Sequence, residues 1–79
     1  MMSALEVSKQ QNYELQKLLT WAGSKARLAE ALNVSRQTVY YWEKRGRISA
    51  TCAKEVEKIT NGLFTKEELR PDVTNWLEQ

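Results

Sequence analysis

The chain has 79 residues, enough for one small domain, and its 42% apolar and 28% charged residues indicate a folded rather than a disordered protein. It contains no His, one Cys and no Gly-rich phosphate loop, so His-dependent triads and His- or Cys-rich zinc sites are excluded, and we expect no enzyme, metal or cofactor. The net charge is only +2, yet residues 24–47 hold six Lys and Arg against two Glu, and such a basic centre is typical of a phosphate-binding surface.

Residues 1–11 lack a helical repeat of apolar side chains, a basic start and a continuous apolar run. We therefore expect a flexible N-terminal arm there, and neither a helix nor a signal peptide. No stretch of about 20 apolar residues follows, and the single Cys52 allows no internal disulfide. These features predict a soluble protein of the cytoplasm.

The next segment predicts two helices in close succession. The first helix is expected to begin after the cap residue Asn12, with apolar residues three and four apart, and to end before Gly23. Ser24 can cap a second helix that reaches Leu32. Asn33 follows it and tolerates the left-handed conformation that a sharp turn requires.

A third and a fourth helix are predicted from their caps. The third helix covers residues 36–45, because Ser35 can cap its start and Gly46 can end it. Ser49 then opens a fourth helix, which closes at residues 61–62.

The last helix is predicted to start at the capping box of residues 65–68, and Pro71 ends it early because it restricts the backbone of Arg70. Residues 72–76 have weak strand character. The predicted fold class is therefore all-α, one small domain of about five short helices with a C-terminal strand or arm. Three conspicuous side chains fall on apolar helix faces and are expected in the core: Trp21, Trp42 and Cys52.

The third helix divides into two unlike faces at 100° per residue. Val39 and Trp42 fall on the apolar face, and Glu43 falls at the edge. The other face has no carboxylate and carries Arg36, Gln37, Tyr40, Tyr41 and Lys44. Arg can bind guanine and Gln can bind adenine through paired hydrogen bonds, and Tyr can contact a thymine methyl or a phosphate. This face indicates base reading in a DNA major groove, because an ordinary solvated face mixes in acids.

Residues 22–49 read AGSKARLAEALNVSRQTVYYWEKRGRIS, and residues 67–73 read EELRPDV. This pattern resembles the Cro family of phage repressors and the YdaS-like prophage regulators, over residues 22–73. Within it, Ala29 matches the close crossing of a helix-turn-helix, and Asn33 stands at the turn position that is more often Gly. The resemblance implies a lambda-repressor-like helix-turn-helix domain. It also implies a sequence-specific DNA-binding transcriptional regulator, a repressor of a phage or prophage promoter in a bacterial cell.

The resemblance implies roles for individual residues. The family's base-reading positions match Arg36, Gln37, Tyr40 and Tyr41. DNA phosphates are expected at the start of the second helix, on the third helix and on the basic turn after it, at Ser24, Lys25, Thr38, Lys44, Arg45 and Arg47. Backbone N–H groups at helix starts also attract phosphate. The expected partner is double-stranded operator DNA, with no membrane and no small-molecule ligand.

We expect a homodimer, formed in solution or on DNA, that binds a pseudo-palindromic operator, because one recognition helix reads few base pairs. The interface is expected outside the DNA face, with four apolar candidates: Phe64, Val73, Trp76 and Leu77. Phe64 and Trp76 would otherwise complete the monomer core. The chain is thus divided into an arm (1–11), a DNA-binding domain (12–72) and a tail (73–79). The alternative is a protein-interaction module, an antitoxin or adaptor, that recognises no promoter.

Overall fold

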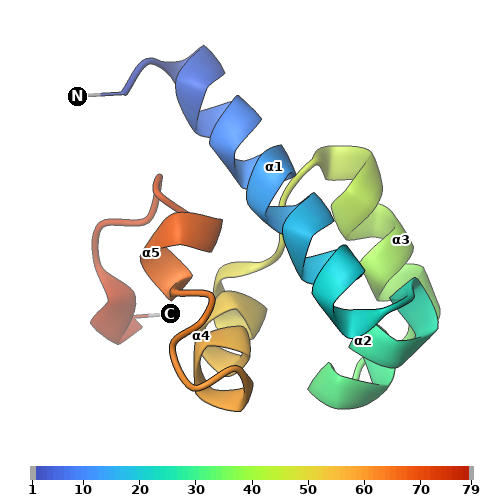
Figure 1. Cartoon of the computed structure of the whole chain (residues 1–79). Helices are drawn as coiled ribbons and strands as arrows, with labels where there is room; N and C mark the ends of the chain where they lie inside the picture. The colour runs from blue at the N-terminus through green and yellow to red at the C-terminus, as the bar shows by residue number, and fades with distance from the viewer. Residues whose placement is uncertain (1, 79) are drawn as a thin grey trace.

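A computed structural model describes residues 2–78, which form helices and connecting turns and no strand. The elements in chain order are α1 (Ala4–Ala22), α2 (Lys25–Leu32), α3 (Arg36–Arg45), α4 (Ala50–Ile59), α5 (Lys66–Leu69) and the 3₁₀ turn η1 (Trp76–Glu78). The long α1 crosses the molecule, with α2 and α3 on one side of it and α4 and α5 on the other (Figure 1). The predicted all-α class is confirmed, and the weak strand expected at residues 72–76 does not form.

The first helix begins at Ala4, so the expectation of a flexible arm is wrong for residues 4–11, and Asn12 is not a cap. Ser3 and Glu6 form a capping box instead. The Ser3 hydroxyl accepts from the Glu6 N–H at 3.2 Å, and Glu6 Oε1 accepts from the Ser3 N–H at 3.3 Å. This reciprocal pair satisfies backbone donors that a helix start leaves open.

Tertiary hydrogen bonds hold the early turns of α1 against the C-terminal part of the chain. The side-chain amide of Gln11 is buried and donates to Asp72 Oδ1 at 2.6 Å. The side-chain amide of Gln10 donates to the Glu68 carbonyl at 3.1 Å. These turns are therefore held by polar contacts, so the helix there has no repeat of apolar residues by which the sequence could predict it.

The four later helices begin at the predicted caps. The side chains of Ser24, Ser35, Ser49 and Thr65 each accept a hydrogen bond from a backbone N–H three residues on. At the C-terminal end of α2, Asn33 has a φ of 56° and takes the left-handed conformation expected of it. The predicted bounds of α2 and α3 are thereby confirmed.

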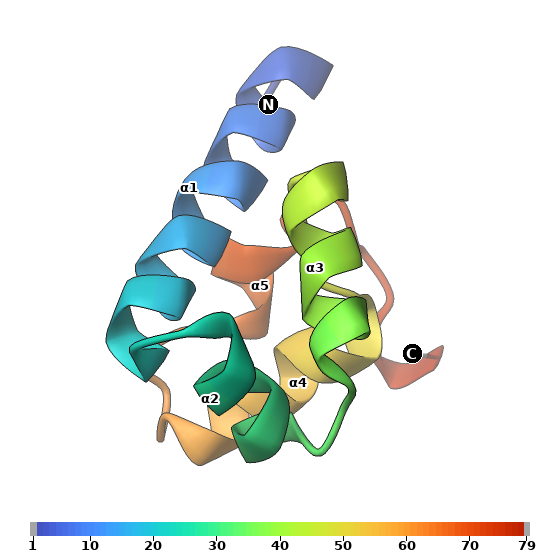
Figure 2. The same ribbon diagram turned by 90° about the vertical axis from the view of Figure 1, so that its right-hand side faces the viewer.

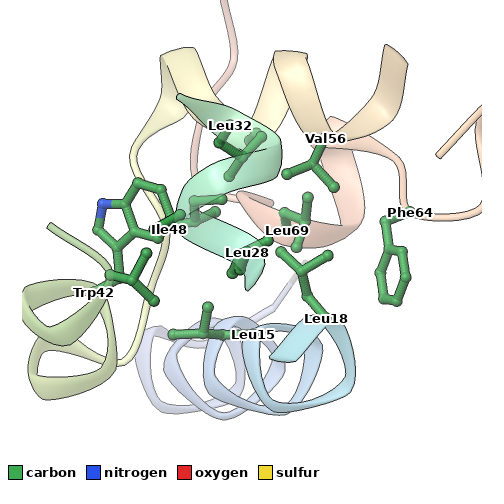
Figure 3. Close-up of a cluster of buried hydrophobic side chains, with 12 residues drawn as sticks. Leu15, Leu18, Leu28, Leu32, Trp42, Ile48, Val56, Phe64 and Leu69 are labelled. Carbon is green, nitrogen blue, oxygen red and sulfur yellow. The ribbon is translucent and has the colours of Figure 1, made fainter. Parts of the chain in front are cut away.

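The core lies among the five helices, where α2 and α5 each pack against both α1 and α4. Side chains from all five helices and from the loops point into it (Figure 3), namely Leu15, Leu18, Leu28, Ala29, Leu32, Val39, Trp42, Ile48, Ala53, Val56, Phe64 and Leu69. Ala29 is buried, and its small side chain allows the close approach of α2 and α3. The burial of Trp42 is confirmed, whereas Cys52 is only partly buried at the edge of the core.

Two aromatic side chains differ from expectation at the outer edge of the core. Trp21 is not a core residue, because 46% of it is exposed. Its ring packs edge-on against Phe64, with 6.1 Å between the ring centroids. Phe64, which lies in the loop before α5, is the buried member of the pair and belongs to the core.

Candidate nucleic-acid interface

The helix α3 presents an exposed outer face, which we define by Arg36, Gln37, Tyr40, Tyr41 and Lys44. Its inner side is fixed by Val39 and Trp42, both buried in the core. Figure 2 looks onto the side of the molecule that carries α3, and no other helix lies in front of it. The division into two faces predicted from the helical period is therefore present, and the outer face meets the steric requirement for entry into a major groove.

Tyr40 lies at the centre of a cationic cluster on this face. The ammonium groups of Lys25 and Lys44 lie 5.9 and 5.6 Å from the centroid of its ring. The ring of Tyr41 is tilted against it, with 6.1 Å between centroids. An ammonium group within about 6 Å of an aromatic ring is attracted to the ring's electrons. The cluster thus joins the start of α2 to the outer face of α3.

The start of α2 carries Ser24 and Lys25 at the surface. The Ser24 hydroxyl accepts from the Arg27 N–H at 3.1 Å, so Ser24 serves as the N-cap. Lys25 Nζ forms an ion pair with Glu43 Oε1 at 2.7 Å, between side chains that are 45% and 33% exposed. This pair was not predicted. The sequence indicates only that Glu43 lies at the edge of the outer face. The crossing of α2 and α3 in the structure shows that Lys25 is its partner.

Thr38 lies apart from the outer face, at the first turn of α3. It is half-buried, and its hydroxyl oxygen lies 3.0 Å from the hydroxyl oxygen of Ser35. Its backbone N–H also donates to Ser35 Oγ at 3.1 Å. Thr38 is thus part of the hydrogen-bonded start of α3.

Three basic side chains, Lys44 and Arg45 in the last turn of α3 and Arg47 just after it, are exposed, and we call them the basic turn. Arg45 and Arg47 border a cavity of about 330 Å³ between the end of α3 and the start of α4. Arg70 also lines it, together with the polar residues Ser49 and Thr51. A cavity with this lining can receive an anion such as a backbone phosphate.

Arg70 is held in place by hydrogen bonds, and the sequence did not predict that it would line a site. Its guanidinium donates to both carboxylate oxygens of Asp72, at 2.9 and 2.8 Å, and to the Ile48 carbonyl at 3.1 Å. These bonds from Arg70, with a further contribution from Arg47, hold the pKa of Asp72 below its ordinary value although partial burial opposes them. The Arg70 charge is thus balanced within the protein, which leaves the anion-binding charge of the cavity to Arg45 and Arg47.

The four apolar candidates for a dimer interface occupy unlike environments. Phe64 is buried in the monomer and completes its core, which is the alternative predicted for this residue. Trp76 is half-buried against the core, with Lys66 Nζ 5.9 Å from the centroid of its ring. Val73 is half-buried, whereas Leu77 is 98% exposed. An apolar side chain with that exposure is the best candidate of the four for contact with another molecule.

Within residues 2–78, no three His, Cys, Asp or Glu side chains gather in a way that could hold a metal ion. No helix of this part of the chain has the length and apolar character needed to cross a membrane.

A family model described as bacterial toxin YdaS matches residues 15–77. No curated protein and no solved structure matches the chain significantly. The matched range runs from α1 to η1 and contains the outer face of α3, the start of α2 and the basic turn.

Proposed function

The chain belongs to the YdaS family, and from this premise we propose that it is a sequence-specific DNA-binding transcriptional regulator, a Cro-like repressor of a phage or prophage promoter. The observation that carries the proposal is the outer face of α3. It groups Arg, Gln, Tyr and Lys side chains without a carboxylate, on a helix whose other side is anchored in the core. The proposal assigns the protein no catalytic role and places it in the bacterial cytoplasm.

In the proposed complex α3 lies in the major groove. Arg36 would bind a guanine and Gln37 an adenine, each through two hydrogen bonds, while Tyr40 and Tyr41 contact neighbouring bases or phosphates. The start of α2 would meet the DNA backbone on one side, as its helix dipole and N–H groups favour. The basic turn would meet the backbone on the other side, where Arg45 and Arg47 border the cavity.

We further propose that two copies bind one operator. One domain of this size offers less contact area than the roughly 1,000–2,500 Å² of protein surface that specific complexes bury. Two-fold symmetry would place the two copies of α3 about 34 Å apart, one turn of DNA. Leu77, Trp76 and Val73 supply the apolar contact, with Leu77 the most exposed of them.

The test compares binding to the region upstream of the protein's own gene with binding to random DNA of equal length. Arg36→Ala and Gln37→Ala should each weaken operator binding by about 1–3 kcal/mol, roughly 5- to 150-fold, and should change random-DNA binding little. Gln16→Ala is the matched control, because Gln16 is an exposed glutamine on α1. Footprints should be symmetric and exceed one helical turn. Equal losses on both DNAs would contradict base reading, and a saturated complex with one protomer would contradict the dimer.

A second function is favoured by an apolar groove of about 420 Å³ on α1 and the loop before α5. Tyr13 and Trp21 line it and are exposed, and Phe64 forms its floor. A protein-interaction module, whether toxin, antitoxin or adaptor, would bind its partner there. The same binding assay separates the two functions, because such a module would show no preference for the upstream region.

A further inference from the structure

Glu43 places a carboxylate beside a surface that otherwise favours a polyanion. Its side chain is one third exposed, and Oε1 lies 2.7 Å from the ammonium of Lys25, the first residue of α2. A phosphate that approaches the start of α2 therefore meets an ammonium whose charge is already balanced. A carboxylate in this position weakens attraction to any DNA, so the benefit it can bring is discrimination between DNA sequences.

We infer that Glu43 is a specificity-determining residue. Its carboxylate keeps Lys25 from binding phosphates in non-specific complexes but allows Lys25 to bind one phosphate in the operator complex. The inference rests on the proposed function. Binding to random DNA is almost wholly electrostatic, so every cation paired within the protein reduces it. Operator binding includes base contacts that fix the register, and a fixed register brings one phosphate to a defined place beside Lys25.

The geometry of the pair permits this exchange. An ammonium group has three N–H donors, so Lys25 can donate to Glu43 and to a correctly placed phosphate at once. The Lys25 side chain is also 45% exposed, so a phosphate at the right place can reach its ammonium while Glu43 remains bound. A sliding complex holds no phosphate at a fixed place, and there the carboxylate repels the backbone.

Tyr40 connects the pair to the base-reading face. The Lys25 ammonium that Glu43 holds lies 5.9 Å from the centroid of the Tyr40 ring. Lys44 lies 5.6 Å from the same centroid and keeps that contact whatever happens to Glu43. The outer face of α3 should therefore stay intact when Glu43 loses its charge, which makes a neutral variant informative.

Glu43→Gln is the decisive variant, because Gln has the same size and can still accept from Lys25 but carries no charge. Each additional phosphate contact makes the plot of log K against log salt concentration steeper by about 0.9, with log K falling as salt rises. At about 0.15 M salt this corresponds to binding of random DNA that is about five-fold tighter, with a salt slope steeper by about 0.9. Operator affinity should change less than about two-fold, so the ratio of operator to random affinity should fall several-fold.

Two controls isolate the mechanism. Glu30→Gln makes the same change of net charge on the exposed side of α2 and should leave both affinities within about two-fold. In a Lys25→Gln background, Glu43→Gln should no longer steepen the salt slope. The inference is wrong if Glu43→Gln leaves random-DNA affinity and its slope unchanged, or tightens both DNAs equally. A loss confined to the operator would also overturn it, since Glu43 would then read a base.

The proposed function fails separately, if the unmodified protein does not prefer the operator. In that case a steeper slope of Glu43→Gln on random DNA would still show that the carboxylate withholds Lys25, and an unchanged slope would still refute it.

Discussion

Replacement of Asp72 by Asn tests the polar junction between the C-terminal segment and α1. Asp72 Oδ1 accepts from Gln11 and from Arg70 Nε, at 2.6 and 2.9 Å, and Oδ2 accepts from Arg70 Nη2 at 2.8 Å. Asn keeps the shape of the side chain but removes its charge. It also replaces one acceptor oxygen with an NH₂ group, which would face a donor.

The expected loss follows from the number and exposure of these bonds. Hydrogen bonds to charged groups contribute about 1.5–3 kcal/mol each. The Asp72 side chain is 33% exposed, so solvent screening reduces the total for Asp72→Asn to about 1–2 kcal/mol. For a domain of this size each kcal/mol lowers Tm by about 4–8 °C, which gives a fall of about 5–15 °C.

The loss should depend on pH in a defined direction. The pKa of Asp72 is lowered in the folded protein, first by its hydrogen bonds from Arg70. Folding therefore favours the charged carboxylate, and its stabilisation is complete above the unfolded pKa of about 4. The stabilisation disappears as the pH falls through the lower folded pKa, so the difference between the two proteins should shrink below about pH 4.

Urea denaturation followed by circular dichroism measures this difference at neutral pH and at about pH 3. Glu67→Gln is the control, because Glu67 pairs with Lys66 at 3.2 Å but is 61% exposed, and its removal should cost less than about 0.5 kcal/mol. An equal loss for Asp72→Asn at both pH values would refute the electrostatic account, since it would assign the whole effect to packing.

Two further outcomes are expected. Arg45→Gln and Arg47→Gln should each flatten the dependence of log K on log salt by about 0.9, on operator and random DNA alike. Fluorescence anisotropy measures these slopes, with Lys58→Gln on α4 as the control. Slopes unchanged in both variants would rule out phosphate contacts at the basic turn. Phe64→Ala should lower the free energy of unfolding by about 3–5 kcal/mol because Phe64 is buried. Leu77→Ala should change it by less than about 0.5 kcal/mol and weaken only two-protomer occupancy of DNA. Comparable effects of both variants on denaturation would contradict a core role for Phe64 and a surface role for Leu77.

The helices that sequence reasoning located well are those whose ends depend on local hydrogen bonds. Each cap binds the backbone N–H three residues further on, so a short stretch of sequence is enough to recognise it. This holds for Ser24, Ser35, Ser49 and Thr65. The two faces of α3 were predictable for a similar reason, because the helical period alone separates Val39 and Trp42 from the outer face.

The features that were not predicted depend on partners distant in the sequence. Gln11 appears as an ordinary polar residue until Asp72, 61 positions away, is placed beside it. The Lys25–Glu43 pair likewise requires the crossing of α2 and α3. Trp21 and Phe64 share one contact but differ in burial, and only the packing of the loop before α5 on α1 determines which ring is covered.

The junction between Gln11 and Asp72 has a consequence for the order in which the chain folds. Its two sides close a loop of about 60 residues, and closing a long loop loses chain entropy before the contact forms. Contacts between α2 and α3 join residues close in sequence and close only a short loop. We therefore expect the α2–α3 pair to form early and the first turns of α1 to dock last. Native-state hydrogen exchange would then find the amides of residues 4–11 opening more readily than those of α3, and equal protection in both would contradict this order.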